Sequence, residues 1–288
     1  MSLPAVLRDW RLRRTASDVW ADTAPIRADL FGIERLEHHA LSLAAAQSVS
    51  QGRPLVVANL IGRVKANAKV LLSAYQAGAR SLDVGQQITP AAEWLLDNFH
   101  IVEQQLRQIE DDLPPGYYRH LPKLSDGPFA GYPRVLGLTW AFVAHTDSLL
   151  TEAVLLRYVQ AYQSVQPLTI GELWAVAITL RIVLIENMRR LAVQITEGQA
   201  LRQAADDIVD QVLTAKASGG SAHAVLARLD RSDLPEIMAA QIAKRLRGTD
   251  PAETPLAGWL EGRLLQLGLT VDAVVSNAQT RQGASNVT

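Results

Sequence analysis

Cysteine is absent from this sequence of 288 residues. Without it the chain cannot form disulfide bonds, a zinc site built from thiolates or a cysteine nucleophile. The absence is compatible with a reducing compartment, where a folded chain depends on its buried core instead of on disulfides.

An excess of charge of one sign is also missing. The chain has 28 Lys and Arg against 29 Asp and Glu, which gives a formal net charge of −1. A nucleic-acid-binding surface requires a basic excess. No nucleic-acid partner is therefore expected.

Long hydrophobic runs form the third absence. The longest apolar run, 173–180, is interrupted by Arg181, resumes at 182–185 and is closed by Glu186. A membrane-spanning helix needs about 20 mainly apolar residues in a row, so this run is too short and too charged. The residues before Arg8 are also too few to form the apolar part of a secretory signal. The run is expected to be a buried helix, and the chain as given is expected to be soluble.

The material that is present is that of a globular protein. Hydrophobic residues make up 48% of the chain and charged residues 20%, as in an ordinary folded domain. A chain of this length can bury one large core or two modest ones.

Helical periodicity runs through most of the chain. Pro25 follows Asp22 and Thr23, an arrangement typical of a helix start, and apolar residues then recur at helical spacing. A second stripe from Leu95 to Ile109 repeats at intervals of three and four residues. No segment alternates as a strand would. The predicted fold class is therefore all-α, a multi-helix bundle.

A Thr-x-x-Glu capping box at Thr169 and Glu172 predicts the start of another helix, expected to reach about Thr196. Further helices are expected at 134–146, 150–165, 199–216, 221–230, 233–247 and 255–267.

The helical pattern stops between residues 113 and 134, where prolines and glycines cluster. Loops of this length inside a domain are uncommon and tend to be either functional or disordered. Its aromatic residues need somewhere to bury, which argues against disorder. We expect one long ordered loop rich in Pro and Tyr at about 113–134.

Three parts of the chain are expected: a basic amphipathic segment at 1–23, a main helical domain at 24–217 and a smaller helical subdomain at 221–288. The Gly- and Ser-rich joint at 217–221 sets the last boundary. The first segment interleaves apolar residues with arginines, so it is either a contact with an anionic membrane surface or a solvated terminus. Its arginines are Arg8, Arg11, Arg13 and Arg14.

Three segments between residues 93 and 192 are unusually rich in polar and aromatic residues: EWLLDNFHIVEQQLRQIEDDLPPGYYRHLPKL, GYPRVLGLTWAFVAHTDS and QPLTIGELWAVAITLRIVLIENMRRLA. In order, spacing and wording they resemble the N-terminal region of bacterial cyclic β-1,2-glucan synthases, and the resemblance spans most of residues 24–288. Those proteins are large inner-membrane glycosyltransferases.

The resemblance implies a longer parent polypeptide that uses UDP-glucose with a divalent metal, with this segment on the cytoplasmic side of the inner membrane. The implied partner is the remainder of that polypeptide, its transferase and membrane domains, with glucan or a membrane surface as further candidates. No cofactor is expected in this segment.

The cluster at Tyr117, Tyr118, Arg119 and His120 has two interpretations. The aromatic rings could stack on a glucose ring while Arg119 and His120 bond its hydroxyls. Alternatively the tyrosines pin the proline-rich loop onto the bundle, which is the reading favoured here. The other candidates for substrate binding or interaction are Tyr132, Arg134, Trp174 and Arg181.

The helix that begins at Thr169 carries a polar stripe interpreted as a solvated or inter-helix face; its members are Glu172, Thr179, Glu186, Arg189 and Arg190. Glu172, Glu186 and Arg190 are candidates for structural ion pairs, and Glu186 is expected to pair with Arg190 four residues later. Arg181 lies opposite that stripe among apolar neighbours. A buried guanidinium must find an acceptor, because stranding its charge is very costly. A structural ion pair is expected there, with Glu93, Asp97 or Asp147 as its acceptor.

Catalytic and metal-binding residues are not predicted. The acidic pairs at 111–112 and 206–207 are adjacent residues, not a spaced pair at a strand end, and Glu34 with His38 is too weak a metal signal. The leading hypothesis is a docking or scaffolding module without its own chemistry. The alternatives are a self-contained carbohydrate-active helical enzyme using Glu172, Glu93 and Asp97, and a glucan-binding module without chemistry.

Overall fold

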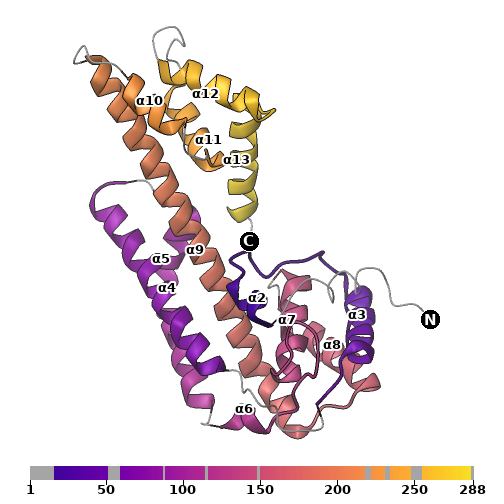
Figure 1. Ribbon diagram of the computed structural model, residues 1–288. Helices are drawn as coiled ribbons and strands as arrows, with labels where there is room; N and C mark the ends of the chain where they lie inside the picture. Colours follow the sequence, from indigo (N-terminus) through magenta and orange to yellow (C-terminus); the bar gives the residue numbers. More distant parts are fainter. Residues whose placement is uncertain are drawn as a thin grey trace. The chain divides into compact units, whose positions relative to one another are not determined.

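The computed structural model describes residues 16–50, 59–86, 88–113, 116–147, 150–217, 222–230, 234–247 and 255–286. Within these ranges the chain forms twelve helices and no strand, which confirms the all-α prediction. Figure 1 shows the helices in chain order. They are α2 (Ala16–Ala21), α3 (Ile33–Ala46), α4 (Leu60–Asp83), α5 (Pro90–Asp112), α6 (Tyr117–His120), α7 (Arg134–Thr146), α8 (Glu152–Val165), α9 (Ile170–Ala217), α10 (His223–Leu229), α11 (Glu236–Arg245), α12 (Pro255–Gln266) and α13 (Val271–Asn286).

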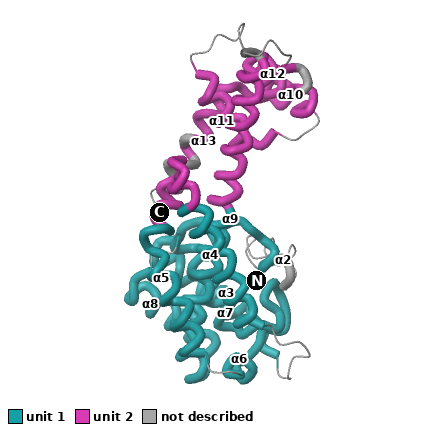
Figure 2. Tube along the Cα trace, turned by 90° about the vertical axis from the view of Figure 1, so that its left-hand side faces the viewer, with its two compact units in different colours: residues 1–79, 95–193 teal, residues 80–94, 194–288 magenta. Residues whose placement is uncertain are grey.

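The chain divides into two compact units, coloured separately in Figure 2. Unit 1 comprises residues 1–79 and 95–193, and unit 2 comprises 80–94 and 194–288. The division falls at Val193, inside α9, and so differs from the expected boundary at the joint of residues 217–221. Part of that joint lies outside the described residues, as do residues 1–15 of the expected basic segment and its four arginines.

Unit 1 has an apolar core in which α3 packs against both α7 and α8 (Figure 1). Tyr158 and Tyr162 of α8 and Phe142 of α7 are completely buried there. Aromatic rings of this size bury a large apolar area and so contribute strongly to the core. The expected apolar stripe of α5 lies in the same core, and Phe99 stacks on Tyr75 with 4.4 Å between the ring centroids.

Unit 2 is a smaller bundle with an aliphatic core. The second half of α9 contributes Ala205, Ile208, Val209 and Val212, at the three- and four-residue spacing of an amphipathic helix. These side chains belong to one apolar cluster with residues of four later helices: Leu229 of α10, Ala239 and Ile242 of α11, Leu256, Leu260 and Leu264 of α12, and Val274 of α13.

The proline-rich stretch folds into a short helix followed by a backbone hairpin. The helix α6 occupies residues 117–120, where a continuous loop was expected. Beyond it, Leu124 and Tyr132 pair through the Leu124 amide and the Tyr132 carbonyl at 3.0 Å, and Phe129 between them is 1% exposed. Gly127 and Gly131 adopt φ values of 76° and 80°, a backbone conformation that favours glycine at these two bends.

Two helix boundaries differ from the sequence prediction. No helix begins at Pro25; residues 22–32 run as an irregular connection and α3 starts at Ile33. The amide of Ile26 is bonded to the Asn187 side chain instead of to the chain next to it, which explains why the local start signal is overridden. The helix expected to end near Thr196 continues to Ala217 as α9.

Candidate functional site: a polar spine on helix α9

The most unusual feature of unit 1 is a row of buried polar side chains on α9. Glu172, Thr179 and Glu186 follow one another at intervals of seven residues, and each is 0% exposed. Residues seven apart in a helix lie on the same face, one above the other. We call these three residues the polar spine. Each of them is hydrogen-bonded to a side chain from a different segment of the chain.

Glu172 forms an ion pair with Arg134, the first residue of α7. The guanidinium donates from Nε to Oε1 at 2.6 Å and from NH2 to Oε2 at 2.7 Å, a bidentate ion pair. Its remaining donors reach Gln166 Oε1 at 2.9 Å and the Pro167 carbonyl at 2.8 Å. Arg134 is 6% exposed. Its donors are engaged inside the protein, so its geometry gives no support to the expected role in substrate binding or interaction.

The predicted capping box is present at the same carboxylate. The Thr169 amide and hydroxyl donate to Glu172 Oε2 at 2.9 and 3.0 Å, and the Glu172 amide donates back to Thr169 Oγ1 at 3.2 Å. Glu172 thus begins the helix and neutralises Arg134 with one side chain. Both of its oxygens accept hydrogen bonds from these donors, one at Oε1 and three at Oε2.

Thr179 is hydrogen-bonded to Tyr118 of helix α6. The hydroxyls of Tyr118 and Thr179 are 2.9 Å apart, and burial raises the pKa of Tyr118 to about 12. Tyr117 donates to the Gly171 carbonyl at 2.6 Å. Lys123, 3% exposed, donates to the carbonyls of Tyr118 and Leu121, and burial lowers its pKa to about 8. These contacts are what the loop-pinning interpretation of the tyrosines requires.

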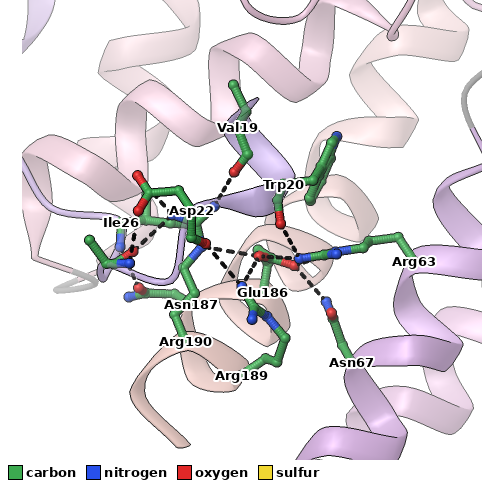
Figure 3. Close-up of polar contacts among 11 residues, drawn as sticks. Val19, Trp20, Asp22, Ile26, Arg63, Asn67, Glu186, Asn187, Arg189 and Arg190 are labelled. Carbon is green, nitrogen blue, oxygen red and sulfur yellow. Dashed lines mark hydrogen bonds and ion pairs between the residues drawn. The ribbon is translucent and has the colours of Figure 1, made fainter. Parts of the chain in front are cut away.

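Glu186 is the centre of the largest polar cluster, shown in Figure 3. Arg63 of α4 donates from Nε to Oε2 and from NH2 to Oε1, both at 2.9 Å. Arg189 and Arg190 donate to Oε1 at 2.7 and 3.0 Å, and Asn67 donates to Oε2 at 2.9 Å. Burial alone would raise the pKa of Glu186, but the hydrogen bonds from Arg63 and Arg189 outweigh it and hold the pKa below its ordinary value. The carboxylate stays ionised.

The same arginines hold residues 19–26, which we call the strap, by its backbone. Arg63 donates to the Trp20 carbonyl at 2.9 Å, and Arg189 donates to the Asp22 carbonyl at 3.2 Å. Arg190 donates to the carbonyls of Val19 and Ala24. Figure 3 shows the strap carbonyls and the Glu186 carboxylate converging on the three guanidiniums.

Three guanidiniums around one carboxylate leave a formal excess of two positive charges. The strap carbonyls offset it, and Asp22 Oδ2 lies 3.9 Å from Arg190 NH1. Aromatic faces add to this: Arg63 lies 5.2 Å from the Trp20 ring centroid and Arg190 lies 5.0 Å from that of Trp140. The cluster therefore binds a peptide segment, and Asp22 and the strap carbonyls offset part of its positive charge from within the chain.

Of the two interpretations of the polar stripe of α9, a solvated face or an inter-helix face, the structure shows the second. The stripe of Glu172, Thr179 and Glu186 is the buried face, and Arg189 and Arg190 are buried with it. Arg181 is on the accessible side: its side chain is 35% exposed and pairs with Asp112, itself 59% exposed, at 3.0 Å. The prediction of a buried Arg181 was wrong: its apolar neighbours are divided between the core, where Ile178 and Ile185 are 5% and 3% exposed, and the surface, where Trp174 is 79% exposed.

The acidic residues that were expected to pair with Arg181 form no ion pair with it. Glu93 and Asp97 are exposed on α5, and no ion pair joins either of them to another described residue. Asp147 pairs with Arg27 at 3.1 Å. The expected acceptors were therefore wrong for Arg181.

The other interaction candidates lie at the surface or next to the strap. Arg119 and His120 are exposed on α6. Tyr132 is half-buried, with its ring centroid 5.7 Å from that of Trp20, and burial raises its pKa. Tyr132 therefore packs on the strap.

A pair of histidines forms a separate titratable cluster in unit 1. The rings of His39 in α3 and His145 in α7 lie 4.5 Å apart, and Phe31 stacks on His145 at 3.9 Å. Burial, with the nearby His145 and Arg35, lowers the pKa of His39 to about 4. His145 Nδ1 lies 2.7 Å from the Asp29 carbonyl. The cluster fastens the connection before α3 to the end of α7.

Three residues of these clusters were missed by the sequence analysis: Arg63, Asn67 and Lys123. A signal existed for one of them. Asn67 interrupts the buried stripe Leu60, Val64 and Leu71 of α4 and is itself 0% exposed. A polar residue at such a position predicts a buried hydrogen-bonding partner. Arg63 and Lys123 carry no comparable local signal.

The chemistry of this region is that of internal recognition. Both carboxylates of the polar spine form ion pairs with arginines. Among the described residues, no group of three or more His, Asp or Glu side chains could hold a metal ion. Across the same described residues, none of the helices combines the length and the apolar character needed to cross a membrane.

Comparison with known proteins gives the chain a family context. No protein-family model matches it. The cyclic beta-(1,2)-glucan synthase NdvB of Rhizobium meliloti (strain 1021) is 34% identical over 263 residues, which is 91% of this chain and 9% of the synthase. The chain thus spans 9% of the length of the curated relative that it matches. The predicted resemblance is confirmed: this chain is homologous to one segment of a cyclic β-1,2-glucan synthase.

Proposed function

We propose that this chain is a helical scaffolding or docking module, without chemistry of its own, within a glycosyltransferase similar to a cyclic β-1,2-glucan synthase. It would lie at the N-terminus of that polypeptide, on the cytoplasmic side of the inner membrane. The parent would build β-1,2-glucan from UDP-glucose with a divalent metal, both held by other parts of the polypeptide.

One observation carries this proposal: the best-placed acids of unit 1 are already neutralised. A transferase needs carboxylates that are free to hold a metal or to take a proton from the acceptor. Glu172 and Glu186 are 0% exposed and bonded to arginines, so neither is free. The charge that these residues carry supports assembly of the bundle.

The alternative of a self-contained carbohydrate-active enzyme loses its main residue by the same observation. A glycoside hydrolase flanks the scissile bond with two accessible carboxyl groups about 5 to 9.5 Å apart. Glu172 was its first candidate and is buried against Arg134 at 2.6 Å. The glucan-binding alternative is also weakened, because the hydroxyls of Tyr117 and Tyr118 are bonded to Gly171 and Thr179.

The proposal is tested in two steps. The purified chain is incubated with radiolabelled UDP-glucose and Mg²⁺ or Mn²⁺, and no glucosyl transfer is expected. The full polypeptide is then prepared with Glu186→Gln, which disturbs the cluster that holds the strap, and with Asp210→Asn, at an exposed position of unit 2, as its matched control.

Glucan output should fall with Glu186→Gln and stay unchanged with Asp210→Asn. Transfer of glucose by the chain alone would contradict the proposal, as would full output from a polypeptide in which this segment is unfolded. Saturable heat on titrating the chain with β-1,2-linked gluco-oligosaccharides would favour the glucan-binding module instead.

A further inference from the structure

The first two turns of α9 expose an apolar face. Ile170 is 76% exposed, Leu173 38% and Trp174 79%, and Ala177 is exposed as well. Their spacing of three and four residues places them in a single row along the helix. We call Ile170, Leu173, Trp174 and Ala177 the apolar stripe.

The stripe departs from the usual polarity of a helix in a folded domain. A surface helix normally turns apolar residues inward and polar residues outward. Here the helix buries Glu172 and Thr179, each 0% exposed, beside apolar residues such as Val176, and presents Ile170 and Trp174 to solvent. An exposed tryptophan in a row with an isoleucine and a leucine is typical of an interaction surface, whereas scattered apolar residues are ordinary.

The backbone beneath the stripe is held firmly. Thr169 and Glu172 cap the helix reciprocally, and the Tyr117 hydroxyl binds the Gly171 carbonyl at 2.6 Å. A surface that is already ordered loses little conformational entropy when a partner binds. The polar spine therefore holds the backbone of the apolar stripe in a fixed conformation, because the polar side of these turns is bonded to the bundle.

We propose that the apolar stripe docks an apolar helical face from the part of the synthase-like polypeptide that lies outside this segment. This inference rests on the proposed function. The matched relative has 91% of its length outside the matching segment, by subtraction of the 9% that is matched. A row spaced by three and four residues fits the groove of another helix.

The charges near the stripe favour this occupant over an anionic bilayer. Arg181 follows Trp174 by seven residues and Ala177 by four, so it continues the row, and it is paired with Asp112 at 3.0 Å. The chain as a whole has a formal net charge of −1. Binding to an anionic membrane surface depends on clustered lysine and arginine side chains. An uncharged apolar row with a neutral ion pair at its end is suited to a protein partner.

The test uses the absence of cysteine from the chain. Trp174→Cys places a thiol in the stripe, and Leu156→Cys places one at an exposed apolar position of α8, which is 55% exposed, as the matched control. Each variant is made both in the isolated chain and in the full polypeptide. Maleimide labelling is followed by mass spectrometry of the peptide that carries the new thiol, so thiols elsewhere do not contribute.

The thiol at position 174 should react at least about tenfold more slowly in the full polypeptide than in the isolated chain, as for a docked state favoured tenfold over the undocked one. The thiol at position 156 should react at the same rate in both. Equal rates at position 174 would overturn the inference. So would self-association of the isolated chain that Trp174→Lys abolishes, which would assign the stripe to a second copy.

Two outcomes separate this inference from the function beneath it. Flotation of the isolated chain with vesicles containing phosphatidylglycerol, lost in Trp174→Lys, would overturn the inference in favour of a lipid surface. A reactive thiol at position 174 together with lost glucan output in Glu186→Gln would refute the docking face and leave the scaffold intact. Glucose transfer by the chain alone would refute the proposed function, whatever the labelling shows.

Discussion

The two halves of α9 bury different kinds of side chain in their units. In unit 1 the helix buries ionised and polar residues, with Glu172, Thr179 and Glu186 all at 0% exposure. In unit 2 it buries only aliphatic residues such as Ala205 and Val209, while its acids stay accessible: the Asp210 side chain is 62% exposed and pairs with Arg245.

This difference separates two kinds of stabilisation. Apolar burial in unit 2 is non-directional and roughly proportional to the area removed from water. The spine of unit 1 gives no better net stability than an apolar seam would, because desolvating charges is costly. What it adds is selectivity, since each polar residue meets a different set of partners: Arg134 at Glu172, Tyr118 at Thr179, and at Glu186 the arginines that also bind the strap carbonyls.

The largest expected effect comes from Glu186→Gln. The change leaves three buried guanidiniums without their carboxylate, and removing one partner of a buried charged cluster costs about 3 to 5 kcal/mol. Urea unfolding followed by circular dichroism should show this loss in the transition of unit 1. The same chemical change at Asp210→Asn in unit 2 should cost under about 1 kcal/mol. Equal losses at the two sites would remove the distinction between the halves of the helix.

Acidification should destabilise unit 1 next most strongly. The pKa of His39 falls from 6.5 to about 4 in the folded chain, so the unfolded chain binds the proton first as the pH drops. The stabilisation is complete above pH 6.5 and is lost progressively down to about pH 4, by up to about 3 kcal/mol.

The measurement is the free energy of unfolding between pH 7.5 and pH 4, with His39→Gln as the comparison. The variant should show a flatter profile for unit 1 over this window. A wild-type profile that rises on acidification would show that the histidine cluster is protonated in the folded state.

A smaller effect is expected from Tyr118→Phe. The change removes the hydroxyl that meets Thr179 at 2.9 Å and keeps the ring, so about 0.5 to 1.5 kcal/mol should be lost. Thr179→Val and the double variant complete a cycle. Additive losses would mean that the two hydroxyls do not interact, and the middle contact of the spine would be refuted.

The smallest effect belongs to unit 2. Arg245→Ala removes an ion pair whose side chains are 41% and 62% exposed, and such surface pairs contribute about 0 to 1 kcal/mol. The unfolding midpoint of unit 2 should barely move, and its dependence on salt should weaken. A loss as large as that at Glu186 would contradict the difference between the two halves of α9.

Local signals in the sequence were informative where they depended on neighbouring residues. The capping box at Thr169 forms as predicted, and α7 and α8 occupy 134–146 and 152–165, close to the expected ranges. A cap involves residues three apart, so its energetics are contained in a short stretch of sequence. The same holds for the glycine bends between residues 127 and 131.

The orientation of α9 was not accessible in that way. Both of its faces mix polar and apolar residues, so periodicity placed Arg181 in the core and left Glu186 on a face that was either solvated or between helices. The assignment depends on Arg63, 123 positions away from Glu186, and on strap carbonyls further still. A helical pattern records how residues repeat along one segment, and says nothing of which distant donors arrive at each side.

The amino-acid order alone was enough to specify a cysteine-free, all-helical chain, most of its helix starts and its kinship with a glucan synthase segment. The fate of each charge followed from three-dimensional packing. A carboxylate such as Glu172 or Glu186 can be buried only when guanidiniums and backbone groups from remote parts of the chain meet it, because an uncompensated charge would cost more than the fold can supply.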